Sequence, residues 1–128
     1  MIKIGCAAYS YREYLKDGRM SYEDFIEEAY RIGLDGVELT LYWLPSKNTS
    51  YLRKIKRLAL FRGLPISCAG ISTNFCNPDS SERKKAIETA KEGLDIAHEL
   101  GAPCLRAVSY THLRAHETSL HLVCRLLL

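Results

Sequence analysis

The sequence lacks the features that mark several common classes of protein. No two cysteines have CxxC spacing, and no GxGxxG or P-loop motif follows the first strand-like segment. No long hydrophobic run is present, and the opening Met-Ile-Lys-Ile leads directly into a strand-like segment without the basic region or cleavage site of a signal peptide. We therefore expect a cytoplasmic protein with no membrane-spanning segment and no nucleotide-binding loop.

The chain also lacks a strong excess of charge. Its 128 residues carry a net charge of +3, with 47% hydrophobic and 26% charged residues, which is typical of one ordinary globular domain. The basic residues between Arg53 and Arg62 share a helix-like segment with an apolar stripe, so they indicate a solvated helix face and not a nucleic-acid surface.

Cysteine is moderately common, with five residues in the chain. Cys6, Cys68 and Cys104 lie inside apolar strand-like runs and have no metal-ligand spacing. We expect them to be buried, reduced thiols that act as small hydrophobic side chains.

Short apolar runs alternate with amphipathic helical segments along the chain. The pattern predicts strands over 3–9, 36–41, 66–72 and 104–108, and helices over 21–33, 50–63 and 81–101. Gly33, Gly63 and Gly101 stand where each helix should end. A βα unit that recurs about every thirty to forty residues predicts a parallel α/β array, and the missing nucleotide loop favours a barrel over an open sheet.

The third of these helices has an apolar stripe at helical spacing. The stripe consists of Ile87, Ala90, Leu94 and Ala97. These four residues therefore share one face of the predicted helix.

The composition changes abruptly at Val108. Three of the four histidines follow it, at His112, His116 and His121, and the first two have the i,i+4 spacing of zinc ligands on a helix. However, residues 108–117 resemble the in-frame translation of a tagmentation sequencing adapter. Residues 122–128 resemble the constant segment that follows the variable index of such adapters. We therefore predict a partial barrel over 1–107 and a non-native, adapter-derived tail over 108–128.

Functional side chains of a parallel barrel lie at the C-terminal ends of its strands. By position, the candidates are Tyr9, Ser10, Tyr11, Glu38, Thr40, Ser72, Thr73, Asn74 and Arg106. Glu38 is the most informative, because a carboxylate within an apolar strand needs a partner or a chemical role. It either forms a structural ion pair with an inward-pointing Arg106 or takes part in catalysis, and the sequence leaves both alternatives open.

Three segments carry a resemblance to a known family. They are the opening Lys3-Ile4-Gly5-Cys6, the run Gly-Leu-Asp-Gly-Val-Glu-Leu over 33–39, and Leu100-Gly101-Ala102. Together they resemble the xylose isomerase-like TIM barrel superfamily and, within it, the sugar phosphate isomerase/epimerase proteins. The resemblance covers residues 1–106 and implies the N-terminal half of a (β/α)8 TIM barrel, with about four strands and three helices.

The resemblance implies a metal-dependent isomerase or epimerase that acts on a small sugar or polyol. It implies a divalent ion (Mn, Mg, Co or Zn), held mainly by two Glu, an Asp and a His on strands of the second half, so no metal ligand is expected in this chain. Glu38 matches the family's Gly-Val-Glu pattern as a residue facing the site. Asn74 and Arg106 are substrate-binding candidates by position. Nucleic-acid and membrane partners are not expected, and the full-length protein has scope for a homo-oligomer.

Three alternatives stay open at this point. One is an inosose dehydratase-like lyase, and another is an AP endonuclease-like barrel, which Thr73-Asn74-Phe75 disfavours because that class has a His ligand after the third strand. The third is a barrel without catalytic activity. We expect the 128-residue chain itself to be an inactive fragment.

Overall fold

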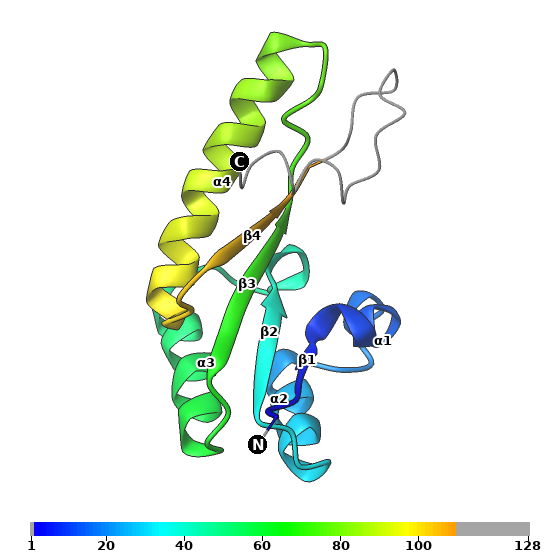
Figure 1. Ribbon diagram of the computed structural model, residues 1–128, viewed down its shortest axis with the longest axis vertical. Helices are drawn as coiled ribbons and strands as arrows, with labels where there is room; N and C mark the ends of the chain where they lie inside the picture. The colour runs from blue at the N-terminus through cyan, green and yellow to red at the C-terminus, as the bar shows by residue number, and fades with distance from the viewer. Residues whose placement is uncertain (1, 110–128) are drawn as a thin grey trace.

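Four parallel strands form one sheet in the order β1-β2-β3-β4 (Figure 1). A computed structural model describes residues 2–109. The strands span Gly5–Ala7 (β1), Gly36–Thr40 (β2), Ile66–Ser72 (β3) and Leu105–Val108 (β4). Each strand pairs in parallel with the next strand along the chain, which confirms the predicted α/β array. The first strand is shorter than the predicted 3–9, because the chain turns into a 3-10 helix, η1 (Ala8–Tyr11), directly after Ala7.

Three long helices connect the strands. They are α2 (Tyr22–Arg31), α3 (Thr49–Phe61) and α4 (Ser80–Leu100), close to their predicted positions. The residue pattern does not predict the short helix α1 (Arg12–Lys16) or the 3-10 helices η1 and η2 (Leu41–Trp43). These elements are too short to show a periodic apolar pattern.

Local interactions explain where the long helices begin and end. Ser21 and Asp24 form a reciprocal capping box that satisfies backbone N–H groups at the start of α2. The backbone φ angles of Gly33, Gly63 and Gly101 are 77°, 68° and 75°, a left-handed conformation that a glycine adopts without steric cost. These ends match the predictions.

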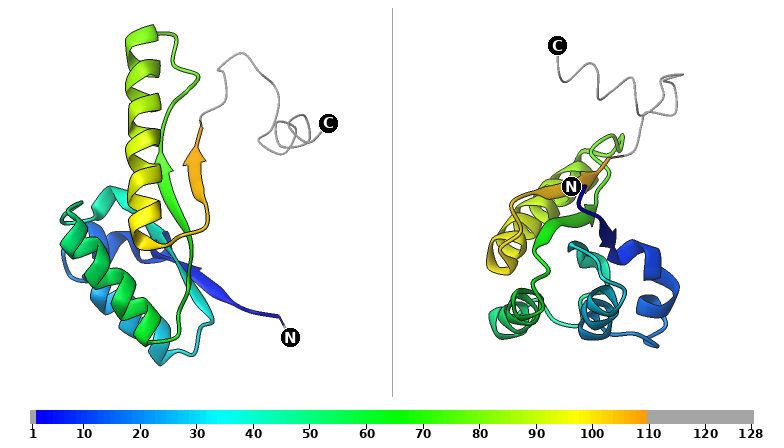
Figure 2. Two further views of the ribbon diagram at one scale, coloured as in Figure 1. Left: turned by 90° about the vertical axis from the view of Figure 1, so that its left-hand side faces the viewer. Right: turned by 60° about the horizontal axis from the view of Figure 1, so that its bottom comes forward.

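The long helices lie on one side of the sheet (Figure 2). Alternate strand residues face them and form the core, including Val37, Leu39, Ala69 and Ile71, all at most 4% exposed. The intervening residues point to the opposite side. We call that side the inner face, defined by Ala7, Glu38, Cys68, Gly70, Cys104 and Arg106.

The apolar stripe predicted for the third long helix holds for only two of its four residues. Ile87 and Leu94 are 47% and 56% exposed, whereas Ala90 packs against the core and Ala97 is buried, as is Ile96. Gly93 turns this face of α4 toward the sheet, because a Cβ atom there would lie 3.1 Å from Ile71 Cγ2 and 3.2 Å from Leu105 Cδ2. A pattern of apolar residues does not predict that a helix approaches the sheet closely at a glycine.

The predicted tail begins within the last strand. Val108 ends β4 opposite Ser72, and beyond Ser109 the tail, with its three histidines, lies outside the described residues. Its adapter origin therefore stays a prediction. No helix within residues 2–109 is long and apolar enough to cross a membrane.

Candidate active site on the inner face of the sheet

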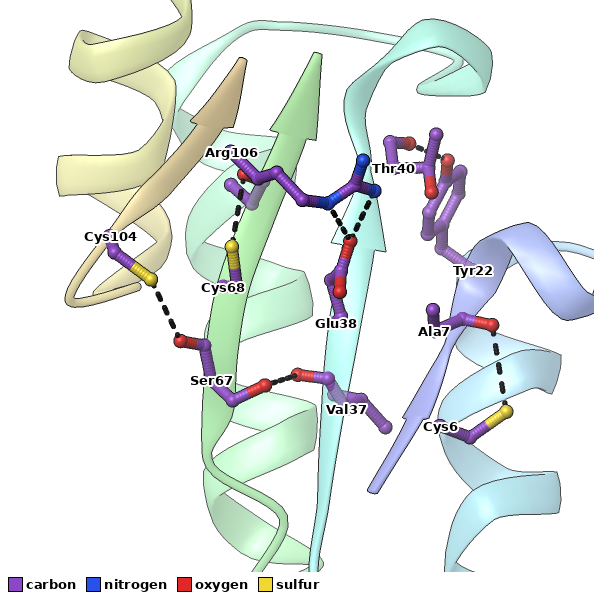
Figure 3. A network of polar contacts seen from close by, with 11 residues as sticks. Cys6, Ala7, Tyr22, Val37, Glu38, Thr40, Ser67, Cys68, Cys104 and Arg106 are labelled. Atoms are coloured by element: carbon purple, nitrogen blue, oxygen red, sulfur yellow. Dashed lines mark hydrogen bonds and ion pairs between the residues drawn. The ribbon is translucent and has the colours of Figure 1, made fainter. Parts of the chain in front are cut away.

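An ion pair crosses the inner face from β2 to β4. Arg106 donates from Nη2 to Glu38 Oε1 at 2.6 Å and from Nε to the same oxygen at 3.1 Å (Figure 3). The two residues are 68 positions apart in the chain and lie on strands separated by β3. The structure thus brings together the two residues that the sequence singled out as potential partners.

Because Gly70 on β3 has no side chain, the Arg106 guanidinium and the Glu38 carboxylate can meet above it. A Cβ atom at Gly70 would lie 2.9 Å from Arg106 Nη2 and 3.2 Å from Glu38 Oε1. Its φ angle is not positive, so the backbone conformation does not call for a glycine. The absence of a side chain therefore serves the contact between the guanidinium and the carboxylate.

The ion pair is only partly shielded from water. The Glu38 side chain is 23% exposed and the Arg106 side chain 45%. The hydrogen bond to Glu38 raises the pKa of Arg106 further above its usual value, so the guanidinium stays charged. At this exposure we expect the pair to contribute about 0–1 kcal/mol to stability, as surface pairs do, and not the roughly 3–5 kcal/mol lost when a buried pair is broken.

Two thiols lie beside the ion pair. Cys68 pairs with Glu38 in the β2–β3 register, and Cys104 stands two residues before Arg106. The expectation of buried thiols is wrong for Cys104, which is exposed, while Cys68 and Cys6 are partly buried. The reason is that Cys104 precedes β4 on the inner face, where no helix covers it.

Aromatic side chains gather where β1 and β2 end. Tyr9 stacks on Trp43 with ring centroids 5.9 Å apart and an interplanar angle of 28°. Tyr42 meets Trp43 edge-on at 5.2 Å, and the Arg12 guanidinium lies 5.2 Å from the centre of the Tyr9 ring. Tyr9 is 47% exposed, so part of this aromatic surface is open to solvent.

The other residues predicted by position mostly serve the fold. Tyr11 packs against Phe25, and the Thr73 hydroxyl donates to the Val108 carbonyl at 3.0 Å. Asn74 Oδ1 accepts from the backbone N–H of Cys76 at 3.1 Å, which leaves its amide NH2 for other contacts.

The remaining predicted residues differ in their exposure. Ser10 and Ser72 are exposed, whereas Thr40 is fully buried, and its Oγ1 has no hydrogen-bond partner among residues 2–109. The Tyr22 hydroxyl donates to the Thr40 carbonyl, and burial raises the pKa of Tyr22. Thr40 therefore belongs to the packing around Tyr22.

The part of the chain that the structure describes does not form a metal centre. No group of three or more His, Cys, Asp and Glu side chains in it is placed to hold a metal ion. On the inner face, Glu38 Oε1 already accepts two hydrogen bonds from Arg106. These residues therefore do not make up the metal site that the family resemblance implies.

The parallel order of the strands and the helices on one face define the chain as part of a (β/α) barrel. A family model described as the xylose isomerase-like TIM barrel matches residues 26–124, which is more than half of the chain. The chain therefore belongs to the xylose isomerase-like TIM barrel family. The matched range also runs past Val108 into the predicted tail. No curated protein matches the chain.

Solved structures agree with this assignment of the fold. A D-psicose 3-epimerase solved with D-fructose is 18% identical with a TM-score of 0.67, covering 83% of this chain and 37% of its own. The D-psicose 3-epimerase of Clostridium cellulolyticum H10 with D-tagatose is 22% identical with a TM-score of 0.70, covering 91% and 41%. The 3-keto-D-glucoside 4-epimerase of E. coli is 15% identical with a TM-score of 0.52, covering 66% and 31%.

The chain spans 37% and 41% of the length of the two psicose epimerases. At these identities the likeness shows the fold, which is the N-terminal half of a (β/α)8 barrel.

Two residues of this site, Trp43 and Gly70, are not among those predicted from the sequence. Trp43 is the single tryptophan of the chain and lies three residues after β2, at the end of η2, which could have marked it. Gly70 lies inside a predicted strand, where glycine weakens the structure and often marks a close approach. The position of Trp43 and the glycine inside a strand are both visible in the sequence, but neither feature indicates which side chain contacts the residue.

Proposed function

We propose that the full-length protein is a sugar isomerase or epimerase that acts on a small sugar or polyol. The observation that carries this proposal is the Glu38–Arg106 pair, because both of its hydrogen bonds use the same carboxylate oxygen. It stands on the inner face of a barrel whose family and structural neighbours include sugar epimerases.

In this proposal Glu38 orients or deprotonates a sugar hydroxyl. Both hydrogen bonds from Arg106 use Oε1, which leaves Oε2 for another donor, and the carboxylate lies on the inner face of the sheet beside Arg106 (Figure 3). A carboxylate oxygen in this state accepts a hydrogen bond or a proton from a hydroxyl group. Arg106 holds the carboxylate in one orientation, which is what a group acting on a bound substrate requires.

Other residues supply the remaining contacts in this proposal. The exposed part of the stack formed by Tyr9 and Trp43 offers an apolar surface to the C–H face of a sugar. The amide NH2 of Asn74 can donate to a sugar oxygen, since its carbonyl is already used in the loop. When bound by residues of later strands, a divalent ion such as Mn, Mg, Co or Zn would polarise the sugar oxygens as a Lewis acid.

An activity assay of the full-length protein tests the proposal. The protein would be incubated with a panel of ketohexoses, aldoses and polyols, with and without Mn²⁺, and the products separated by chromatography. We expect one sugar to be converted into its isomer or epimer. Loss of water from a polyol would instead indicate a lyase, and no conversion of any compound would contradict the proposal.

Glu38→Gln tests the role of the carboxylate, because glutamine keeps the shape and removes the charge. We expect a large loss of turnover and a change of at most about 1 kcal/mol in the free energy of unfolding. The control is Glu28→Gln, which removes a similarly exposed Glu–Arg ion pair from helix α2, where Glu28 is 27% exposed. If both variants keep full turnover, Glu38 has only a structural role.

A further inference from the structure

The two cysteines of the inner face are neighbours across the β3–β4 boundary. Ala69 pairs with Leu105 in this register, so the preceding residues, Cys68 and Cys104, stand opposite each other. The backbone N–H of Ala69 donates to the Cys104 carbonyl at 3.0 Å, which fixes the two backbones together at this position. Figure 3 shows both thiols on the same side of the sheet as Glu38 and Arg106.

The backbone geometry is compatible with a covalent link. Neighbouring strands lie about 4.7–4.9 Å apart, within the roughly 4.4–6.8 Å that a disulfide requires between Cα atoms. Both side chains leave the sheet in the same direction, and each sulfur is held by a weak hydrogen bond, from Cys68 Sγ to the Ala69 carbonyl and from Cys104 Sγ to the Ser67 carbonyl, both at 3.4 Å. Cys104 also lies just outside β4, so its backbone has fewer ladder contacts to disturb.

The two thiols differ in a way that suits a two-step oxidation. Cys104 is exposed, and its Sγ donates only a weak hydrogen bond at 3.4 Å to the Ser67 carbonyl. Burial, together with contact with Cys104, raises the pKa of the Cys68 thiol to about 11. An oxidant in solution therefore reaches Cys104 first, while Cys68 stays protonated beside it.

From this geometry we infer that Cys68 and Cys104 form a peroxide-sensitive dithiol site that closes to an intramolecular disulfide. The Cys104 thiolate attacks one oxygen of hydrogen peroxide, which forms a sulfenic acid and releases hydroxide. The Cys68 sulfur then attacks the Cys104 sulfur, and the sulfenic oxygen leaves as water. In total, two thiols and one peroxide give one disulfide and two waters.

The disulfide would join β3 to β4 directly beside the ion pair. Cys104 is two residues before Arg106, and Cys68 is two residues before Gly70, so all four lie on the inner face. The disulfide would therefore restrict the movement of β4, the strand that carries Arg106. The inference about the bond itself does not depend on the proposed function.

The test uses the 128-residue chain with Cys6, Cys76 and Cys124 replaced by serine, so that only this pair remains. The protein is treated with hydrogen peroxide at low micromolar concentration, and the fraction that runs as a single chain on a non-reducing denaturing gel is digested with trypsin. Cleavage isolates Cys68 in the peptide 63–83 and Cys104 in the peptide 92–106. We expect loss of both free thiols and one linked product of these peptides, lighter than their sum by two hydrogen atoms.

Two control variants sharpen the result. With Cys68→Ser added, we expect no linked product and a Cys104 sulfenic acid that dimedone traps. A chain that keeps only Cys6 and Cys68 should form no link, because Cys6 faces the helices and packs against the core. Linked peptides found only in dimers would overturn the inference. So would equal dimedone trapping of Cys104 with and without Cys68.

Discussion

Gly70→Ala is the substitution that tests most directly how the inner face is built. The new methyl group would lie 2.9 Å from Arg106 Nη2 and 3.2 Å from Glu38 Oε1. The first distance is shorter than a Cβ atom tolerates, so the guanidinium must move away. Because the guanidinium is the end of a flexible side chain, it can move without disturbing the strands.

Two opposing effects set the change in stability. An alanine in a strand is about 0.5–1 kcal/mol more stable than a glycine, because the unfolded chain loses less conformational freedom on folding. Loss of the partly exposed ion pair removes about 0.2–1 kcal/mol. We therefore expect the free energy of unfolding of Gly70→Ala to stay within about 1 kcal/mol of the wild-type value.

The effect on the site should be much larger than the effect on stability. If Glu38 acts on a bound sugar, displacing Arg106 leaves the carboxylate free to rotate. Misplacement of a reacting group by about 1 Å can lower turnover roughly 10²-fold. We expect a loss of kcat of this order.

Three measurements on the full-length protein separate these effects. Urea unfolding gives the stability, chromatography of sugar products gives the turnover, and NMR gives the solvent exchange of the Arg106 Nε–H proton. That proton should exchange faster in Gly70→Ala, because its bond to Glu38 is lost. An unchanged exchange rate together with unchanged turnover would show that the ion pair tolerates the methyl group, and the reasoning would be wrong.

Gly93→Ala is the matched control. Its methyl group would meet Ile71 Cγ2 at 3.1 Å and Leu105 Cδ2 at 3.2 Å where α4 packs on the sheet, so these packed side chains must shift to make room. Overpacking costs about 1–3 kcal/mol, and the better helix propensity of alanine offsets roughly 1 kcal/mol of it. We expect a lower stability than that of Gly70→Ala, with the Arg106 Nε–H exchange unchanged.

Three further predictions concern other parts of the chain. Ser21→Ala should lower the free energy of unfolding by about 1 kcal/mol, measured with urea, because it removes one half of the capping box with Asp24. The purified 128-residue chain should self-associate and show no isomerase activity, because the outer edges of β1 and β4 have no strand partner within residues 2–109. Light scattering that shows a folded monomer without binding of a hydrophobic dye would contradict this. Genomic DNA amplified across the Arg106 codon by another library chemistry should continue into a different sequence, and recovery of the codons for 108–128 would refute the adapter origin.

The sequence by itself determined the elements whose causes are local. The capping box that begins α2 spans four consecutive residues, and Gly33, Gly63 and Gly101 end the helices through their own backbone conformation. Interactions of this kind involve residues close together in the chain, so a pattern of residue types contains all the necessary information. The alternation of strands and helices followed from the short apolar runs and the helical periods, which are also local patterns.

Only the tertiary structure decided which face of α4 meets the sheet. The helical period of the sequence allowed Ile87 and Leu94 to be buried, but the contact of Gly93 with β3 and β4 exposes them. The exposure of Cys104 was decided in the same way, because it depends on which side of the sheet the helices cover.

The ion pair shows most clearly where reasoning from the sequence ends. The sequence named Glu38 and Arg106 and allowed them to pair, but the pairing depends on the register of β2, β3 and β4 and on the space above Gly70. Register and clearance arise only when strands far apart in the chain are packed side by side. A contact across 68 residues is therefore a property of the folded sheet, because no local preference of either residue specifies it.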